Sequence, residues 1–431
     1  MDPDNGDYRP APGSPARGYG CQTFPGKDRV PHAAPASPAM AHDLARRDVI
    51  DVSGLISVDT VWDADTVRVV GDVTVTDGAI LTIVPGVRVE FQDYYALYVA
   101  GSIVAVGTPA DRILFTTHDP QDFGVDQSHT GCWNGMRFES TPATNAPSHL
   151  AYCIVEYSKA TGGGGGLYPY GGGAVSAVDF SKLTIENCIF RSNVADYGGA
   201  LFFYRNANPR IAGNLIVDNH ALQNASAIYC AYSHPQIANN TIVGNPIHNE
   251  ENPYIDSCAV LNFLSKPVFT NNIIRDNNPD VVYMHTQLWH NKDYYTHHNN
   301  IEGYESIGGN IDADPRFADP DNGDYDLSFR SPCIDAGDNV AAPADGFDLD
   351  GRLRVARFVV DMGAYEVPFG DLNCDGRVDF GDINPFVLAL SDPSAWQAAY
   401  PGCELLYGDI SGDQELDFGD INPFVALLTG W

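Results

Sequence analysis

Basic residues are scarce in this sequence. Lys and Arg total 24 against 56 Asp and Glu, which gives a formal net charge of −32 over 431 residues. A chain this acidic repels the phosphates of nucleic acids and of anionic lipids. Long apolar runs are also missing, because no stretch approaches the roughly 18 residues that a membrane-spanning helix needs. The sequence therefore predicts no nucleic-acid partner and no membrane span.

Two further signals are missing. The first 45 residues are rich in Pro, Gly and Ala and lack the apolar segment of a secretory signal, so export is not directly visible. The nine cysteines show no C-x-x-C spacing, which argues against a zinc or redox motif. Nine is an odd number, so at least one cysteine is unpaired in a monomer. We expect most of them to be small, buried, apolar side chains.

A short pattern recurs through the middle of the chain. Its clearest copies occupy residues 185–193, 211–219, 237–245 and 269–277, at spacings of 26, 26 and 32 residues, and weaker copies begin at 150 and 296. Within each copy the apolar stretches are short, rich in β-branched and aromatic residues, and bounded by Gly, Pro, Asn and Asp, which is typical of strands. A repeat of this length predicts a solenoid of short strands.

Asparagines recur at fixed places in these copies. One column holds Asn187, Asn239 and Asn271, and another holds Asn193, Asn219, Asn245 and Asn277. In a solenoid the same position of each turn lies over its predecessor. Asn tolerates left-handed backbone and its amide can bond neighbouring backbone. We therefore expect internal turn ladders, with a polar ligand-binding row as the alternative.

These repeats resemble the right-handed parallel β-helix proteins of the pectin-lyase-like fold. Residues 69–87, 97–107, 113–116 and 133–136 are similar to the opening coils of extracellular members, and residues 331–337, 348–352 and 361–366 resemble the segment that closes such helices before an appended module. The resemblance covers roughly residues 50–367 and implies a mainly β fold, but no one activity.

The N-terminal segment repeats a later one. Residues 2–8 (DPDNGDY) are identical to residues 319–325. We hypothesise that residues 1–45 are an irregular remnant of a preceding β-helix end in a longer exported protein, which would account for the missing signal. The predicted organisation is this segment, then a β-helix over residues 46–369, and a small module over residues 370–431.

The C-terminal module contains two acidic twelve-residue loops that start 38 residues apart. A Ca²⁺ ion takes six to eight oxygen ligands, and a loop with oxygen donors at positions 1, 3, 5, 9 and 12 and a carbonyl at position 7 supplies them. The predicted ligands are Asp371, Asn373, Asp375, the Arg377 carbonyl, Asp379 and Asp382 in the first loop, and Asp409, Ser411, Asp413, the Glu415 carbonyl, Asp417 and Asp420 in the second. The module carries one Arg against eleven Asp and Glu, so we expect it to fold only with Ca²⁺.

Each loop leads into an Ile-Asn-Pro-Phe-Val segment, where Asn384 and Asn422 are expected to N-cap short helices. This duplicated loop and helix resembles a dockerin domain, which implies docking onto a cohesin-like protein. Gln414 stands where position 6 is usually Gly, so the second site is expected to bind Ca²⁺ more weakly. The repeated Phe-Gly pairs at 380–381 and 418–419 occupy the partner-reading positions of dockerins. In an exported protein, a disulfide is expected between Cys374 and Cys403, which flank the first loop and its helix.

Catalytic motifs of enzymes with this fold are missing. The resemblance includes pectate and alginate lyases, polygalacturonases and epimerases, but the sequence has neither the Asn-Thr-Asp, Asp-Asp and Gly-His-Gly set nor Arg-x-Pro-x-x-Arg. A sugar platform is predicted instead from Asp179, Tyr204, Arg205 and Tyr229, with Ala231 and Phe263 placed in the column of Asp179 and Arg205. Ordinary surface ion pairs and stacked aromatics are the alternative. The histidines near residues 294–300 are expected to belong to a polar turn.

Together these features predict a secreted or cell-surface, calcium-binding β-helix protein that binds or processes polysaccharide and carries a dockerin-like tail. Two alternatives stay open. One is a polysaccharide lyase or glycoside hydrolase with unrecognised catalytic residues, and the other is a non-catalytic structural surface solenoid. The substrate and the docking partner are not determined by the sequence.

Overall fold

The computed structural model describes residues 49–139, 141–162, 171–246, 258–277, 288–290, 295–304, 306–342, 346–355 and 359–429. The predicted N-terminal segment, residues 1–45, lies outside the described residues.

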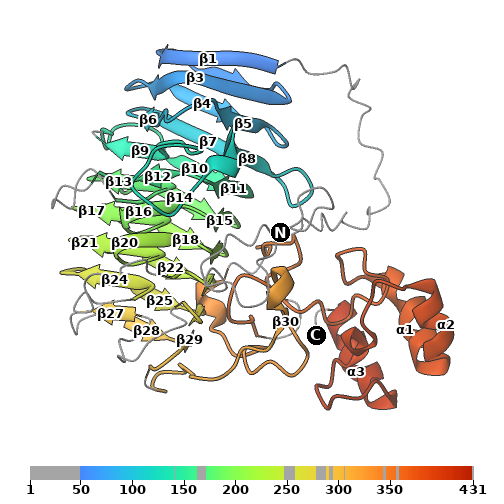
Figure 1. Cartoon of the computed structure of the whole chain (residues 1–431). Helices are drawn as coiled ribbons and strands as arrows, with labels where there is room; N and C mark the ends of the chain where they lie inside the picture. Colours follow the sequence, from blue (N-terminus) through green and yellow to red (C-terminus); the bar gives the residue numbers. More distant parts are fainter. Residues whose placement is uncertain are drawn as a thin grey trace, which may run out of the picture.

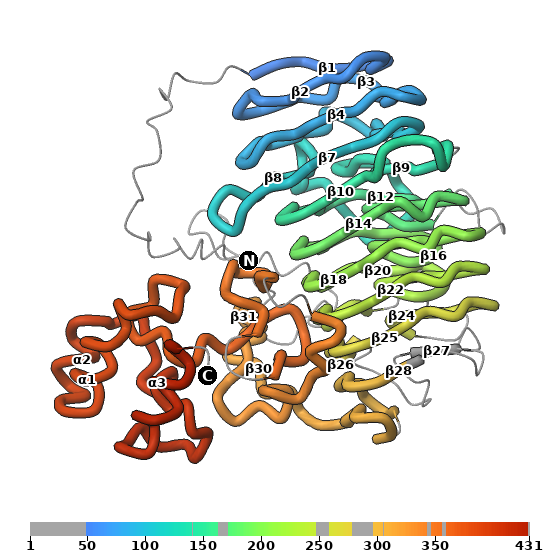
Figure 2. The backbone as a smooth tube through the Cα atoms, turned by 180° about the vertical axis from the view of Figure 1, so that it is seen from behind, coloured from blue at the N-terminus to red at the C-terminus, as the bar shows by residue number. Residues whose placement is uncertain are grey.

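Short parallel strands form three faces of a stacked coil (Figures 1 and 2). The first face contains β3 (Thr66–Val75), β6 (Leu97–Val99), β9 (Met136–Glu139), β13 (Val175–Val178), β17 (Leu201–Tyr204), β21 (Ile228–Ala231), β24 (Val260–Phe263) and β27 (Leu288–His290). The second face contains β2 (Thr60–Trp62), β4 (Ile80–Ile83), β7 (Ser102–Val106), β10 (Ser148–Ala151), β14 (Leu183–Glu186), β18 (Arg210–Ala212), β22 (Gln236–Ala238), β25 (Val268–Thr270) and β28 (Tyr295–His297).

The third face also begins at the long strand β3, which bends between two faces and joins them into one sheet. It continues through β5 (Arg88–Phe91), β8 (Ile113–Thr117), β11 (Cys153–Glu156), β15 (Ile189–Arg191), β19 (Leu215–Val217), β23 (Thr241–Val243), β26 (Ile273–Arg275) and β29 (Asn300–Ile301). The strand β1 (Val49–Ile56) pairs with β3, and a short extra sheet contains β12 (Lys159–Ala160), β16 (Val194–Tyr197) and β20 (His220–Asn224).

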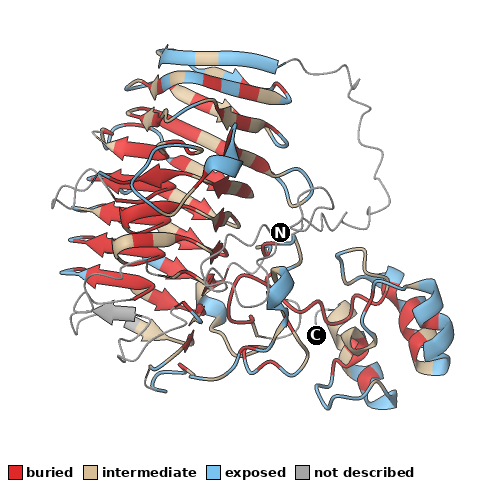
Figure 3. Ribbon diagram, viewed as in Figure 1, coloured by how far each residue is buried: buried red, intermediate tan, exposed pale blue. Residues whose placement is uncertain are grey.

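The strand registers confirm the predicted repeat. Ile185 pairs with Ile211, Ile211 with Ile237, and Ile237 with Phe269, so the coils have the spacings read from the sequence. Even the weaker copies fit, since Leu150 pairs with Ile185. Alternate residues point inward and form a buried apolar interior. Figure 3 shows that most residues in the strands of the central coils are buried.

Buried asparagines form two ladders inside the coils. In the first, the Nδ2 groups of Asn193, Asn219 and Asn245 each donate to the Oδ1 of the next asparagine, ending at Asn277. This confirms the expected ladder. A second ladder, which the sequence analysis did not identify, runs one residue after the other predicted column, through Asn214, Asn240, Asn272, Asn299 and Asn310.

The predicted column of Asn187, Asn239 and Asn271 has the expected left-handed backbone, with φ of 50°, 56° and 60°. Its amides bond a distant part of the chain, and Nδ2 of Asn187 also donates to the Tyr152 hydroxyl of the preceding coil. Nδ2 of Asn187 donates to the carbonyl of Phe347, and Nδ2 of Asn271 to that of Asp338, both at 3.0 Å. This column therefore anchors the segment that follows the last coil.

That closing segment, residues 317–369, lies along the side of the solenoid. It contains the hairpin of β30 (Phe317–Asp319) and β31 (Asp324–Leu327), joined by the 3-10 turn η3 (Pro320–Asn322), and the turn η4 (Asn339–Ala341). Its Tyr325, Leu349 and Tyr365 pack against Leu215 and Val243 on the third face. The apolar outer surface of that face explains this path, because it is buried only if the chain returns over it.

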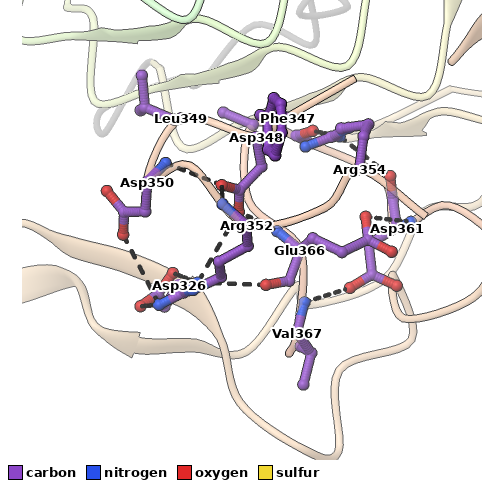
Figure 4. A network of polar contacts seen from close by, with 12 residues as sticks. Asp326, Phe347, Asp348, Leu349, Asp350, Arg352, Arg354, Asp361, Glu366 and Val367 are labelled. Atoms are coloured by element: carbon purple, nitrogen blue, oxygen red, sulfur yellow. Dashed lines mark hydrogen bonds and ion pairs between the residues drawn. The ribbon is translucent and has the colours of Figure 1, made fainter. Parts of the chain in front are cut away.

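A charged network holds the closing segment together (Figure 4). The guanidinium of Arg352 donates to both oxygens of Asp326, at 2.9 and 3.2 Å. Asp348 is buried beside it, and its carboxylate accepts N–H groups from Arg352 and Glu366. Burial raises the pKa of Asp361 to about 7, although its oxygens accept the backbone N–H groups of Asp335 and Val367.

The C-terminal module contains three helices, α1 (Ile383–Ser391), α2 (Pro393–Ala399) and α3 (Ile421–Thr429), with the 3-10 turns η5 (Phe380–Asp382), η6 (Leu405–Gly408) and η7 (Phe418–Asp420). A further 3-10 turn, η2 (Pro120–Asp122), lies in the solenoid. None of the helices in the described residues has the length and hydropathy of a membrane span.

Two details of this module differ from the prediction. Asn384 and Asn422 lie in the first turns of α1 and α3 and are not N-caps. Helical structure begins earlier because Asp379 and Asp417 each form a capping box around η5 and η7. The helix α2 was not predicted, although Asp392 and Pro393 are a recognisable start, and the Asp392 side chain accepts the N–H of Ala395.

Candidate functional sites

The first predicted calcium loop is folded around its own carboxylates. Asp371 accepts the backbone N–H groups of Asp375 and Gly376. Asp382, at the other end of the loop, accepts those of Leu372, Asn373 and Asp379 at 2.9 to 3.1 Å. The first and last predicted ligands are thus held in a closed loop by backbone donors.

The second loop repeats the same bonds. Asp409 accepts the N–H groups of Asp413 and Gln414, and Asp420 accepts those of Ser411 and Asp417. Gln414 has φ of 73°, close to the 85° of its counterpart Gly376. A side chain in this left-handed conformation costs about 1–2 kcal/mol, which is the physical reason to expect a less stable second loop.

Buried negative charge accumulates in both loops. Asp371, Asp382, Asp409 and Asp420 are all buried. In the part of the chain that the structure describes, none of them takes part in an ion pair with a basic side chain. Burial and the neighbouring Asp382 charge raise the pKa of Asp371 to about 7, and burial raises that of Asp382 to about 6. These oxygens fit a hard cation such as Ca²⁺, which would supply the missing positive charge.

The cysteines fall into two groups. Cys374 and Cys403 form a disulfide, which ties the first loop to the chain after α2. Of the other cysteines in the described residues, Cys132, Cys153, Cys188, Cys230, Cys258 and Cys333 are buried and lie outside any disulfide, as expected. Cys153 and Cys188 lie in neighbouring coils, and the backbone nitrogen of Cys153 lies 3.4 Å from Sγ of Cys188.

The two halves of the module expose matching apolar side chains. Phe386 and Phe424 stack inside with ring centroids 4.2 Å apart, which pairs α1 with α3. Phe380 and Phe418 are 72% and 80% exposed. They continue along the helices with exposed Ile383 and Val387 in one half and Ile421 and Val425 in the other. We call these six side chains the duplicated apolar face.

The predicted sugar platform is only partly assembled. Arg205 donates to Asp179 at 2.7 Å, and its guanidinium lies 5.3 Å from the centre of the Tyr204 ring. Tyr229 is wrong as a platform residue, because it is 4% exposed and stacks on Phe202. Around Tyr229, the outer surface of the first face is covered by other apolar side chains.

The prediction that Ala231 and Phe263 continue the column of Asp179 and Arg205 is wrong by one residue. Tyr204 pairs with Ala231, and Ala231 with Phe263, so Tyr232 and Leu264 are the residues that follow in the column of Asp179 and Arg205. All four have left-handed backbone. Sequence reasoning missed that the coil containing Tyr232 is one residue longer before this corner, as shown by the 26-residue step from Asp179 to Arg205 and the 27-residue step to Tyr232.

An exposed stripe therefore runs along this corner of the solenoid. Tyr232 is 43% exposed and packs edge-to-face between the rings of Tyr204 and Phe263, at 6.1 and 5.7 Å. With the Arg205–Asp179 ion pair at one end and exposed Leu264 at the other, the stripe combines aromatic surface with charged hydrogen-bonding groups. Aromatic surface and charged hydrogen-bonding groups are the features with which protein sites bind sugar rings.

A cavity of about 270 Å³ lies at the opposite margin of the second face, where the closing segment meets the coils. Its polar lining includes Tyr152, Glu186, Arg210 and Arg354, and Phe347 adds an aromatic wall. Glu186 is 2.8 Å from Nε2 of His149, and this hydrogen bond lowers the pKa of Glu186. The sequence analysis missed this site because Arg354 and Phe347 come from a segment that no local pattern places beside Glu186.

Residues 149–311 match the family model described as the right handed beta helix region. No curated protein matches the chain. The matched range contains the coils whose parallel registers are described above. Together, the match and the parallel faces support a mainly β protein that contains a right-handed β-helix region, with short helices near its C-terminal end.

Proposed function

We propose that this chain is a secreted or cell-surface, calcium-binding β-helix protein that binds polysaccharide on its solenoid and docks through a dockerin-like tail. The observation that carries the calcium assignment is the set of four buried aspartates in twin loops, without a basic partner among the described residues. A buried carboxylate without a counter-charge is costly, and a bound cation removes that cost. The disulfide and the demand for Ca²⁺ both favour an oxidising, calcium-rich location.

The polysaccharide assignment rests on the two margins of the second face. One margin carries the exposed stripe with Arg205 and Tyr232, and the other carries the cavity with Glu186 and Arg210. The strands β14 and β18 between the margins are 4 and 3 residues long, about 10–13 Å, so several linked sugars rather than one ring are needed to contact both. The guanidinium groups favour an acidic polysaccharide, because Arg binds carboxylates through paired hydrogen bonds.

Retention on immobilised glycans tests this assignment. In the presence of Ca²⁺ the protein is expected to be retained by a uronic-acid polysaccharide more strongly than by a neutral one. The variants Tyr232→Ala and Arg210→Ala are each expected to weaken binding about tenfold, which corresponds to about 1.4 kcal/mol, since each removes one contact from a different margin.

The matched control is Arg68→Ala. Arg68 is exposed and forms a 2.7 Å ion pair with Asp51, like the Arg205–Asp179 pair, but lies at the first coil. Its removal is expected to leave retention unchanged. Equal retention of wild type, Y232A and R210A would contradict the polysaccharide assignment.

A polysaccharide lyase is the second candidate function. The cavity brings Glu186, held ionised by His149, beside Arg210 and Tyr152, a combination able to accept a proton and to neutralise a uronate carboxylate. Hydrolysis is less well supported, because it needs two carboxyl groups around one bond and Glu186 is the only carboxylate among the described residues of the lining. In the same glycan panel, unsaturated products that disappear in Glu186→Gln would support the lyase.

The proposed docking partner is a cohesin-like protein that covers the duplicated apolar face. The two halves of this face carry the same residues in the same order, so a partner can use either half. We expect at least one member of a panel of purified cohesin domains to bind in Ca²⁺. The double variant F380A/F418A is expected to lose at least about 100-fold in affinity, because truncating buried aromatic anchors costs 2 kcal/mol or more, whereas each single variant loses much less.

Val340→Ala provides the control for docking, since Val340 is an even more exposed apolar residue but lies in the closing segment. It is expected to bind like the wild type. Failure of every cohesin domain to bind, or full binding by the double variant, would overturn the docking assignment.

A further inference from the structure

We propose that His297, His298 and Asp338 form a binding site for a divalent transition-metal ion of the Zn²⁺ type. One ligand atom from each of the three lies within 4.8 Å of the other two. These residues belong neither to the acidic loops nor to the cavity lined by Glu186. The sequence analysis placed the two histidines in an ordinary polar turn.

The spacing of the ligand atoms fits a tetrahedral metal. Nδ1 of His297 lies 3.3 Å from Nδ1 of His298 and 3.7 Å from Oδ2 of Asp338. In a tetrahedral zinc site with metal–ligand bonds of about 2.0–2.2 Å, neighbouring ligand atoms are about 3.3–3.6 Å apart. Two of the three separations are therefore close to this geometry and the third is at most 4.8 Å, so a bound zinc ion would draw the His298 ring and the Asp338 carboxylate closer together.

The backbone explains why two consecutive histidines face one point. His297 ends the strand β28, and neighbouring side chains along a strand normally point to opposite sides. His298 has left-handed backbone, with φ of 55°, which turns the chain at this residue. The His298 ring then lies against Gly309. A Cβ atom added to Gly309 would come within 2.6 Å of that ring.

Asp338 is brought to this point by the closing segment. Its backbone N–H donates to Oδ1 of Asn271, and its carbonyl accepts Nδ2 of the same asparagine. Its Oδ1 accepts the N–H of Val340, and Oδ2 faces His297. A solenoid corner thus holds a carboxylate from a segment 40 residues away over the two imidazoles.

The remaining nitrogen of His297 has a partner suited to a metal ligand. Its Nε2 lies 3.2 Å from Oγ1 of the buried Thr270 on the neighbouring strand β25. Metal-binding histidines commonly use their second nitrogen in this way, which fixes the orientation of the ring. Two imidazoles and one carboxylate favour Zn²⁺, Co²⁺ or Ni²⁺ over Ca²⁺, which prefers oxygen ligands alone.

Co²⁺ is a suitable probe because its visible absorption reports tetrahedral coordination. The full chain, freed of metals and then saturated with Ca²⁺, is expected to bind one equivalent of Co²⁺ with an intense tetrahedral spectrum that Zn²⁺ abolishes. His298→Ala and Asp338→Asn are each expected to weaken binding by at least about 100-fold. Thr270→Val, which removes only the partner of Nε2, is expected to weaken it about tenfold and keep the spectrum.

His118→Ala is the matched control, because His118 is also a surface histidine paired with a carboxylate, Glu90. It is expected to bind Co²⁺ like the wild type. Absence of a tetrahedral spectrum, or its persistence in H298A, would show that the cluster is only a hydrogen-bonded polar turn.

Discussion

In excess EGTA, helices α1 and α3 are expected to lose their protection against hydrogen exchange, while the solenoid strands keep theirs. Without Ca²⁺ each loop buries two carboxylates and no basic partner among the described residues offsets them. One uncompensated buried charge costs about 3–5 kcal/mol, which is as much as the whole core of a module this small supplies. Hydrogen exchange followed by mass spectrometry on residues 383–391 and 421–429 measures the effect directly.

Variants separate loss of the ion from other effects of the chelator. The double variant Asp371→Ala with Asp409→Ala is expected to exchange rapidly even in Ca²⁺, because each change removes the first ligand of one loop. Glu404→Gln removes a negative charge from the same module outside both loops, and we expect it to keep the wild-type response. Slow exchange of α1 and α3 in EGTA would refute calcium-dependent folding.

Asn240→Leu is expected to destabilise the solenoid by about 3 kcal/mol or more. Oδ1 of Asn240 accepts the N–H and the Nδ2 of Asn214, and its Nδ2 donates to the carbonyl of Ile211 and to Asn272. Leucine has a similar size but none of these groups. Each buried donor or acceptor left without a partner costs about 1–3 kcal/mol. Guanidinium denaturation followed by the β-sheet signal in circular dichroism tests the prediction.

The control for this ladder is Asn322→Leu, because Asn322 is exposed in the turn η3 outside the solenoid. We expect its denaturation midpoint to stay within experimental error of the wild type. If N240L unfolds at the wild-type midpoint, the asparagine ladder does not stabilise the coils, and packing of the apolar interior accounts for the stability alone.

The solenoid could be predicted from the sequence because each coil packs against the coil that precedes it in the chain. Ile185, Ile211 and Ile237 lie over one another because each coil has the same length, so a period in the sequence becomes a register in space. The acidic loops could also be predicted from the sequence, because their contacts are local in the chain. Asp371 and Asp382 lie eleven residues apart, and their bonds stay within one turn of chain.

The repeat spacing predicted the wrong residues at the corner after the first face, because one coil contains an additional residue. One additional residue before Tyr232 moved Ala231 and Phe263 out of the column of Arg205, and Tyr229 was assigned to the surface when it is buried. A one-residue shift along a strand reverses the side to which each side chain points. The spacing between repeats in the sequence does not show at which position of a coil the additional residue lies.

The sequence by itself determined that this protein is a strand-built solenoid with a duplicated acidic tail, because both features are periodic and local. Only the tertiary structure decided where the closing segment lies. Its return along the third face places Arg354 beside Glu186, and Asp338 beside His297. That path follows from burial of apolar side chains and from hydrogen bonds to Asn187 and Asn271, which join residues too far apart in the chain for any repeat to record.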